Sequence, residues 1–147
     1  MTDEAFRFVE AAIRGAVNRQ GFMKLVGAKI DELAPGKAVL SLERRDDVLQ
    51  QHGFFHGGAI AFLVDNATTI AAGTLVREPG SAVLTAEYKL NFTAPARGGA
   101  IVCEASVLKP GKRMVVVEAK VFSVESGERK LCAVALATIA ITEAAKT

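Results

Sequence analysis

The stretch that decides the fold is Gly57–Val76, which reads GGAIAFLVDNATTIAAGTLV. Small and aliphatic residues dominate it, and its polar side chains are confined to Asp65, Asn66 and three threonines. A helix that is apolar nearly all round is a buried helix, because no face of it suits water. We therefore predict a long, buried central helix here, with Gly73 as its one weak point.

The segments on either side of this helix have the patterns of β-strands. Before it, Ala28–Leu33 and Ala38–Glu43 flank a Pro-Gly turn and predict a hairpin, and the polar stretch Arg44–Phe55 predicts a loop. After it, a turn at Arg77–Ser81 leads into four strand-like stretches with short connections, so neighbouring strands should be antiparallel. The four stretches are Ala82–Phe92, Ala100–Leu108, Met114–Ser123 and Lys130–Thr142.

At the N-terminus, the apolar rhythm of Phe6, Val9, Ile13 and Val17 predicts an amphipathic helix over Asp3–Arg19, which Gly21 closes. The expected fold class is α+β, in which a strongly curved antiparallel sheet wraps around one long central helix. The 147 residues suit a single domain, 1–147, with 1–21 as a helical extension.

Composition excludes several classes of protein. A net charge of +2, evenly spread, argues against nucleic acid as a partner. The N-terminus lacks the apolar core of a signal peptide, and no apolar run is long enough to span a membrane. Cys103 and Cys132 lie in apolar strands and predict two reduced, buried thiols, so we expect a cytoplasmic protein. His52 and His56 have no acidic pair at ligand spacing, so no metal site is predicted.

The segment Gln50–Gly58, QQHGFFHGG, runs directly into the central helix and carries the first candidate for chemistry. Two glycines at a helix start are poor helix formers, but they let a ligand approach free N–H groups at the positive end of the helix dipole. Such a turn can polarise a carbonyl and stabilise an oxyanion. The alternative is that Gly57 and Gly58 only permit a tight turn, with His56 bonded to the backbone as a structural residue.

Asp65 is the second candidate, because a carboxylate within an apolar helix is costly unless it is paired or functional. The alternative is that it faces a solvent-exposed edge or caps a loop amide. Asp65 follows Gly57 by eight residues, which is about 12 Å along a helix. One reacting carbonyl cannot contact both groups of the same chain. If both act, the site must be shared between two subunits.

The order of elements, with His56-Gly57-Gly58 followed by Asp65-Asn66, resembles the hotdog-fold acyl-CoA thioesterases of the PaaI-like branch. The resemblance extends from about Phe22 to Thr142. It implies hydrolysis of an acyl-CoA thioester to a free acid and CoA, with no cofactor beyond the coenzyme A of the substrate. It also implies a homodimer with active sites at the subunit interface, or a tetramer of paired dimers.

The resemblance also implies roles for individual residues. Asp65 would be the nucleophile or general base, and the Gly57 N–H would polarise the thioester carbonyl in a loop shaped by His56. Gln50, or the adjoining Gln51, would orient the water or the carboxylate, and Thr85 would hold the water. The residues expected to bind substrate are Gly58, Phe54, Phe55 and Asn66, with Lys109, Lys112 and Arg113 for the CoA phosphates.

Related members often have Asn where this chain has Gln50, whereas sister branches acting on aromatic acyl-CoAs have Gln, so the acyl group stays open. Two other functions also stay open. A hotdog-fold hydratase or dehydratase would pair His52 with Asp65, thirteen residues later. A non-catalytic acyl-CoA-binding protein would keep the fold without turnover.

Overall fold

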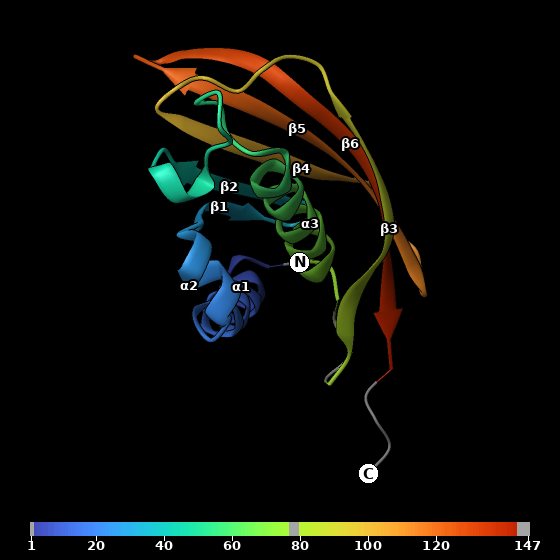
Figure 1. Cartoon of the computed structure of the whole chain (residues 1–147). Helices are drawn as coiled ribbons and strands as arrows, with labels where there is room; N and C mark the ends of the chain where they lie inside the picture. The colour runs from blue at the N-terminus through green and yellow to red at the C-terminus, as the bar shows by residue number, and fades with distance from the viewer. Residues whose placement is uncertain (1, 77–79, 144–147) are drawn as a thin grey trace.

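The computed structural model describes residues 2–76 and 80–143 (Figure 1). Two helices, α1 and α2, precede the hairpin β1–β2, a single 3-10 turn follows it, and α3 and four long strands complete the chain. The bounds are α1 Asp3–Asn18, α2 Gly21–Val26, β1 Lys29–Ala34, β2 Lys37–Glu43, the 3-10 turn Asp46–Val48, α3 Gly57–Gly73, β3 Ala82–Phe92, β4 Ala100–Lys109, β5 Met114–Glu125 and β6 Glu128–Thr142.

The strands form one antiparallel sheet in the order β1-β2-β4-β5-β6-β3, and its concave face curves over α3 (Figure 1). The prediction that sequential neighbours pair was wrong for β3, which pairs with β6 at the edge instead of with β4. The reason lies in the segment 93–99, which crosses the end of the sheet. Thr93 N–H donates to the Cys132 carbonyl on β6, and the Gly99 carbonyl accepts from Arg44 N–H beyond β2.

The predicted central helix is α3, and it packs against β2, β3, β4, β5 and β6. It ends three residues earlier than predicted, at Gly73. The reason is Thr74, whose hydroxyl is fully buried, donates to the Ala71 carbonyl at 2.6 Å and accepts from Gly36 N–H at 2.7 Å. The predicted turn after this helix lies partly outside the described residues, because residues 77–79 are not described.

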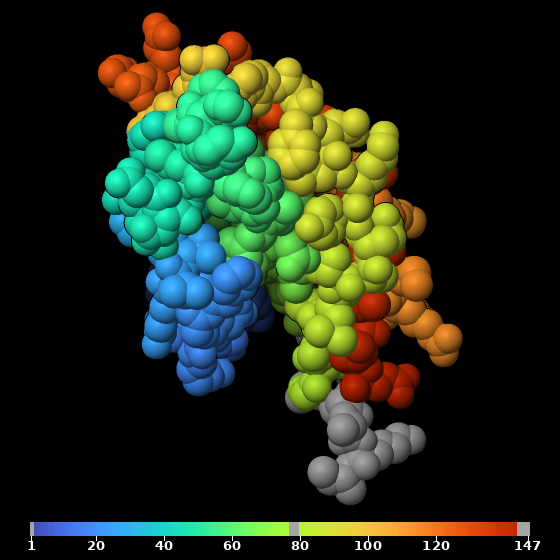
Figure 2. Space-filling model, in the orientation of Figure 1, coloured from blue at the N-terminus to red at the C-terminus, as the bar shows by residue number. Residues whose placement is uncertain are grey.

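The prediction that α3 is buried all round was wrong along one strip. Residues at four-residue intervals along it, namely Ala61, Asp65, Thr69 and Gly73, are only partly buried. Figure 2 shows this strip as green atoms at the surface, between the N-terminal helices and β3. The sheet and the N-terminal helices of one chain therefore leave one side of the helix uncovered.

β3 borders the uncovered strip of α3 and runs in the direction opposite to the helix. A Cβ added to Gly73 would lie 3.5 Å from Val83, at the start of β3. Thr85 binds Asp65 in the middle of the helix, and a Cβ added to Gly57 would lie 3.3 Å from the Phe92 ring at the end of β3. The single strand β3 therefore accompanies the helix from its C-terminus to its N-terminus.

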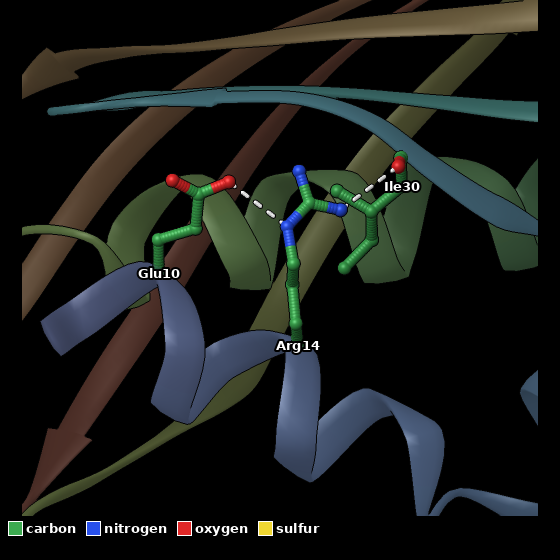
Figure 3. A network of polar contacts seen from close by, with 3 residues as sticks. All are labelled: Glu10, Arg14 and Ile30. Atoms are coloured by element: carbon green, nitrogen blue, oxygen red, sulfur yellow. Dashed lines mark hydrogen bonds and ion pairs between the residues drawn. The ribbon is translucent and has the colours of Figure 1, made fainter. Parts of the chain in front are cut away.

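The N-terminal prediction was right for the first helix and wrong for Gly21, which begins the short helix α2 instead of closing α1. Arg14 attaches α1 to the sheet, because its guanidinium donates to the Ile30 carbonyl at 3.1 Å and to Glu10 at 2.9 Å (Figure 3). No helix among the described residues is long and apolar enough to cross a membrane.

Both cysteines are free and buried, as predicted. Burial raises the pKa of the Cys103 thiol above its usual range, and burial is also the main cause of a raised pKa at Cys132. Each sulfur is therefore a protonated thiol at neutral pH, with the low reactivity of a small core hydrophobe.

Candidate active site

The first turn of α3 presents one free backbone donor. Gly58 N–H donates to the His56 Nδ1 atom at 2.8 Å, and the N–H groups of Ala59 and Ile60 donate to the His56 carbonyl. No acceptor in the described part of the chain meets the Gly57 N–H. The positive end of the helix dipole therefore coincides with one unused donor, which can polarise a carbonyl oxygen placed against it.

His56 builds this turn as the N-cap of α3, so the structural role considered for it from the sequence is the one observed. The Nδ1 atom of its imidazole accepts from Gly58 N–H, and the backbone N–H of His56 donates to the Val48 carbonyl at 2.8 Å. Phe55 N–H donates to the Ala96 carbonyl at 2.9 Å, which connects the loop to the crossing segment 93–99. The Gly57 donor is therefore fixed by the backbone of the residues before it.

Both glycines leave room that a side chain would fill. A Cβ at Gly57 would come within 3.3 Å of the Phe92 ring, and a Cβ at Gly58 would come within 3.0 Å of His56 Nδ1. The second contact would disturb the N-cap hydrogen bond. Gly57 thus leaves space between the helix start and Phe92, and Gly58 leaves space for the His56 side chain that caps the helix.

A pocket of about 460 Å³ opens beside Gly57. Four predicted site residues line it, namely Gln50, Phe54, Phe55 and Gly57, together with Ile60, Phe92 and residues 93–96. Its wall is mostly apolar, with Gln50 and Thr93 as polar groups, which is the usual character of a small-molecule site. Gln51 is exposed, so Gln50 is the glutamine that faces this pocket.

His56 and Gly58 lie on the other side of the helix start, where a second pocket of about 390 Å³ separates α3 from α2. Phe22 and Phe62 form part of its wall, and their ring centroids are 4.7 Å apart. Asn66, predicted to bind substrate, donates its amide to the Phe62 carbonyl of its own helix at 3.0 Å.

Asp65 is half-buried on the uncovered strip of α3, and its carboxylate accepts a hydrogen bond from Thr85, which is bonded in turn to Thr69. Thr85 donates its hydroxyl proton to Asp65 Oδ1 at 2.6 Å. Thr69 lies 2.8 Å from the Thr85 hydroxyl and must be the donor of that bond, because the single Thr85 proton is already used. Sequence reasoning missed Thr69, although its position one turn after Asp65 was a usable signal.

The structure does not bring all predicted residues together. Lys109 is the last residue of β4, and Lys112 and Arg113 follow in the β4–β5 connection, at the end of the sheet where α3 terminates. Within one chain they therefore lie away from Gly57. None of the three lines the pocket beside Gly57 in one chain, and their role in binding the CoA phosphates stays a prediction. His52 is exposed beside Gln50, to whose side chain its N–H donates, while the Asp65 partner is Thr85.

Comparisons with known proteins relate the chain to thioesterases. The model of the thioesterase superfamily matches residues 52–130. The 1,4-dihydroxy-2-naphthoyl-CoA hydrolase of Listeria monocytogenes is 31% identical over 126 residues, covering 86% of this chain and 99% of the relative. The crystal structure of a thioesterase family protein from Silicibacter pomeroyi superposes with a TM-score of 0.87 at 36% identity, covering 90% of this chain and 97% of the other.

The PaaI protein of Escherichia coli shares the fold, with a TM-score of 0.81 at 20% identity over 92% of this chain and 94% of its own. The antiparallel sheet wrapped around one long helix is the hotdog fold of the thioesterases. The chain belongs to the thioesterase superfamily. The prediction of an acyl-CoA thioesterase of the PaaI-like kind is confirmed.

Proposed function

We propose that the chain hydrolyses acyl-CoA thioesters in a site shared by two copies, with Gly57 from one copy and Asp65 from the other. The observation that carries this proposal is the unused Gly57 N–H, which opens into an apolar pocket and lies eight residues from the carboxylate. In each chain the Gly57 N–H and the Asp65 carboxylate lie too far apart to act on one carbonyl. A two-fold pairing of two chains would bring the Gly57 N–H of one chain close to the carboxylate of the other.

In this mechanism the thioester carbonyl oxygen accepts a hydrogen bond from Gly57 N–H, which stabilises the negative charge that develops on attack. Asp65 of the partner subunit attacks the carbonyl carbon, or removes a proton from the water that does so. The carbon–sulfur bond breaks, and the CoA thiolate leaves and takes up a proton. Where Asp65 itself attacks, the product is an anhydride between the acyl group and Asp65, and water then hydrolyses it to the free acid and restores the carboxylate. The Thr69–Thr85 chain fixes the orientation of the carboxylate during this step.

The acyl group would lie in the pocket beside Gly57, against Phe54, Ile60 and Phe92. Gln50 is the side chain there that can hydrogen-bond a water or a polar group on the acyl chain. Arg97 stacks on the outer part of this wall, with its guanidinium 4.3 Å from the centre of the Phe54 ring.

The test mixes two inactive variants. Gly57→Pro removes the N–H at the first helical position, where proline is well accepted, and the extended backbone of His56 suits a following proline. Asp65→Asn removes the charge of the other half. Equal mixing after co-refolding should restore about one quarter of wild-type activity, since half of the dimers are mixed and each has one intact site.

Release of CoA thiol from an acyl-CoA gives the readout, and each variant refolded alone is the control. Absence of recovery in a mixture that demonstrably contains mixed dimers would contradict the shared site. A fully active Asp65→Asn variant would contradict the role of the carboxylate.

A further inference from the structure

Arg44 connects two loops that are far apart in the sequence. Its Nη2 group donates to the Gly53 carbonyl at 2.6 Å, and its Nη1 group donates to the Arg97 carbonyl at 2.8 Å. Its backbone N–H donates to the Gly99 carbonyl at 2.8 Å. Arg44 directly follows β2, so one residue at the end of a strand binds the turn at Gly53 and the segment 93–99 at the same time.

The acceptors of the Arg44 side chain are main-chain carbonyls, and no described carboxylate pairs with its guanidinium. The planar guanidinium presents its two Nη groups in fixed directions, so it can reach both loops, whereas the single Nζ of a lysine would reach one. Arg44 is also exposed, so water can replace its hydrogen bonds and the fold should survive its loss. These contacts suit a residue that positions two backbone segments relative to each other.

The two loops form opposite walls of the pocket at the start of α3. Gln50 and Phe54 line one wall, and residues 93–96 line the other. Gly53 belongs to the first wall, because its N–H donates to the Gln50 carbonyl at 2.9 Å and it directly precedes Phe54. On the second wall, the acceptor is the residue that follows the pocket lining. Arg44 is therefore bonded to both walls, just outside the pocket.

One of these walls is fixed to the sheet. Gly98 N–H donates to the Ser123 hydroxyl on β5 at 2.8 Å, and this contact is buried. A side chain at Gly98 would also collide with the β5 backbone, so the segment 93–99 lies directly against that strand. Arg44 thus holds the turn at Gly53 against a rigid frame. The position of that turn relative to the frame sets the distance between the walls.

We propose that Arg44 is a positioning residue that sets the width of this pocket and thereby determines which acyl groups fit it. This inference rests on the proposed function, in which the acyl group occupies the pocket. Wider separation of the walls would break one of the two short hydrogen bonds of the guanidinium. Without them the Gln50 turn can move away from the segment 93–97, and the pocket should hold its preferred acyl group less tightly and accept bulkier ones.

Binding of acyl-CoAs in the Asp65→Asn background tests the pocket without turnover. Arg44→Met keeps the aliphatic stem of the side chain and removes its donors. It should raise the dissociation constant of the acyl-CoA that the parent binds most tightly about 10-fold, and that of bulkier acyl-CoAs less than about 3-fold. Isothermal titration with acyl-CoAs of graded length and with phenylacetyl-CoA measures both effects.

Steady-state kinetics in the otherwise wild-type chain give a second measurement. Arg44→Met should raise KM for the preferred substrate and reduce the preference among acyl groups, with little change in kcat. Arg44→Lys should lie between wild type and Arg44→Met, because one donor remains. Guanidinium ion, well below the concentrations that unfold proteins, should restore the preference in Arg44→Ala, and the same concentration of NaCl should not.

Arg45→Gln is the matched control. This neighbouring arginine also binds a carbonyl, that of Leu25 on α2, and pairs with Asp47, but it contacts neither wall of the pocket beside Gly57. Its loss should leave the preference among acyl groups unchanged. A uniform loss of affinity for all acyl-CoAs in Arg44→Met, with a lower melting temperature, would show that Arg44 only stabilises the fold and would overturn the inference.

Phe54→Leu distinguishes this inference from the function on which it rests, because Phe54 lines the pocket itself. A change of acyl preference in Phe54→Leu but not in Arg44→Met would overturn the role of Arg44 and leave the acyl pocket standing. An unchanged preference in both variants would place the acyl group elsewhere and overturn both proposals. A changed preference in both, restored by guanidinium ion in Arg44→Ala, is the result we expect.

Discussion

The two halves of the candidate site lie on one helix, but one is a backbone group and the other is a side-chain group. At the start of α3 the functional group is a backbone N–H, left free by the cap that His56 forms. In the middle of α3 it is a carboxylate that accepts a hydrogen bond from the Thr85 hydroxyl on β3, which is bonded in turn to the Thr69 hydroxyl on the helix. The first half depends on the path of the main chain, and the second depends on the identity of three side chains.

This difference determines how each half can be damaged. A side-chain group disappears with one conservative substitution, whereas a backbone donor survives almost any substitution except proline. Changes around the backbone half should therefore act through fit and stability, and changes around the carboxylate half should act on the chemical step.

Asp65→Asn should have the largest effect. An uncharged amide can neither attack the thioester nor accept a proton from water, so kcat should fall about 10³-fold. Steady-state hydrolysis of an acyl-CoA, followed by thiol release, measures this. Asp31→Asn, which alters an exposed carboxylate on β1, is the matched control, and an equal loss there would remove Asp65 from the mechanism.

Gly57→Pro and Gly57→Ala should separate the amide from the space around it. Both add a Cβ near Phe92, but only proline removes the N–H, so kcat should fall about 10²-fold for proline and less than about 10-fold for alanine. Phe92→Leu in the alanine background should recover part of the smaller loss. Equal defects for the two variants would argue that Gly57 matters only for packing.

Thr69→Val should lower kcat by a smaller factor, about 3- to 10-fold, because it removes the donor that orients Thr85. Thr69→Ser keeps a hydroxyl and should restore the rate. Thr68→Val changes a fully buried neighbour that bonds to its own helix, and it should affect the melting temperature without affecting kcat. A rate loss that serine does not restore would point to packing instead of hydrogen bonding.

His56→Ala should have the smallest effect on chemistry and a measurable effect on stability. Loss of the N-cap hydrogen bond should lower the free energy of unfolding by about 1 kcal/mol, which denaturant titration resolves. His56→Asn retains a good capping side chain and should recover most of it. A His56→Asn variant that folds normally but is as inactive as Asp65→Asn would assign the imidazole a direct part in the reaction.

Much of this could be predicted from sequence because the signals are local. The small-residue helix, the strand alternation and the His-Gly-Gly turn each depend on residues close in the chain, and so do the bounds of β3, which agree with the prediction at both ends. The place of β3 beside β6 could not be predicted, since it depends on where the segment 93–99 crosses the sheet.

The residues of the candidate site also fall into those that local sequence predicts and those that only the fold brings together. Gly57, Gln50 and Phe54 were predicted from one continuous segment and do share a pocket. The Thr69–Thr85–Asp65 chain joins a helix to a strand sixteen residues away, and only the fold reveals that contact. Lys109, Lys112 and Arg113 carry the right charge for phosphates, but residue type alone does not reveal at which end of the sheet a residue lies.

The uncovered strip of α3 has a consequence for dilute solutions. Under the proposed shared site, an isolated chain would hold the first half of one site and the second half of another, and no complete site. Specific activity should then depend on the total concentration of the chain, falling as dilution separates the copies and returning when they are concentrated again.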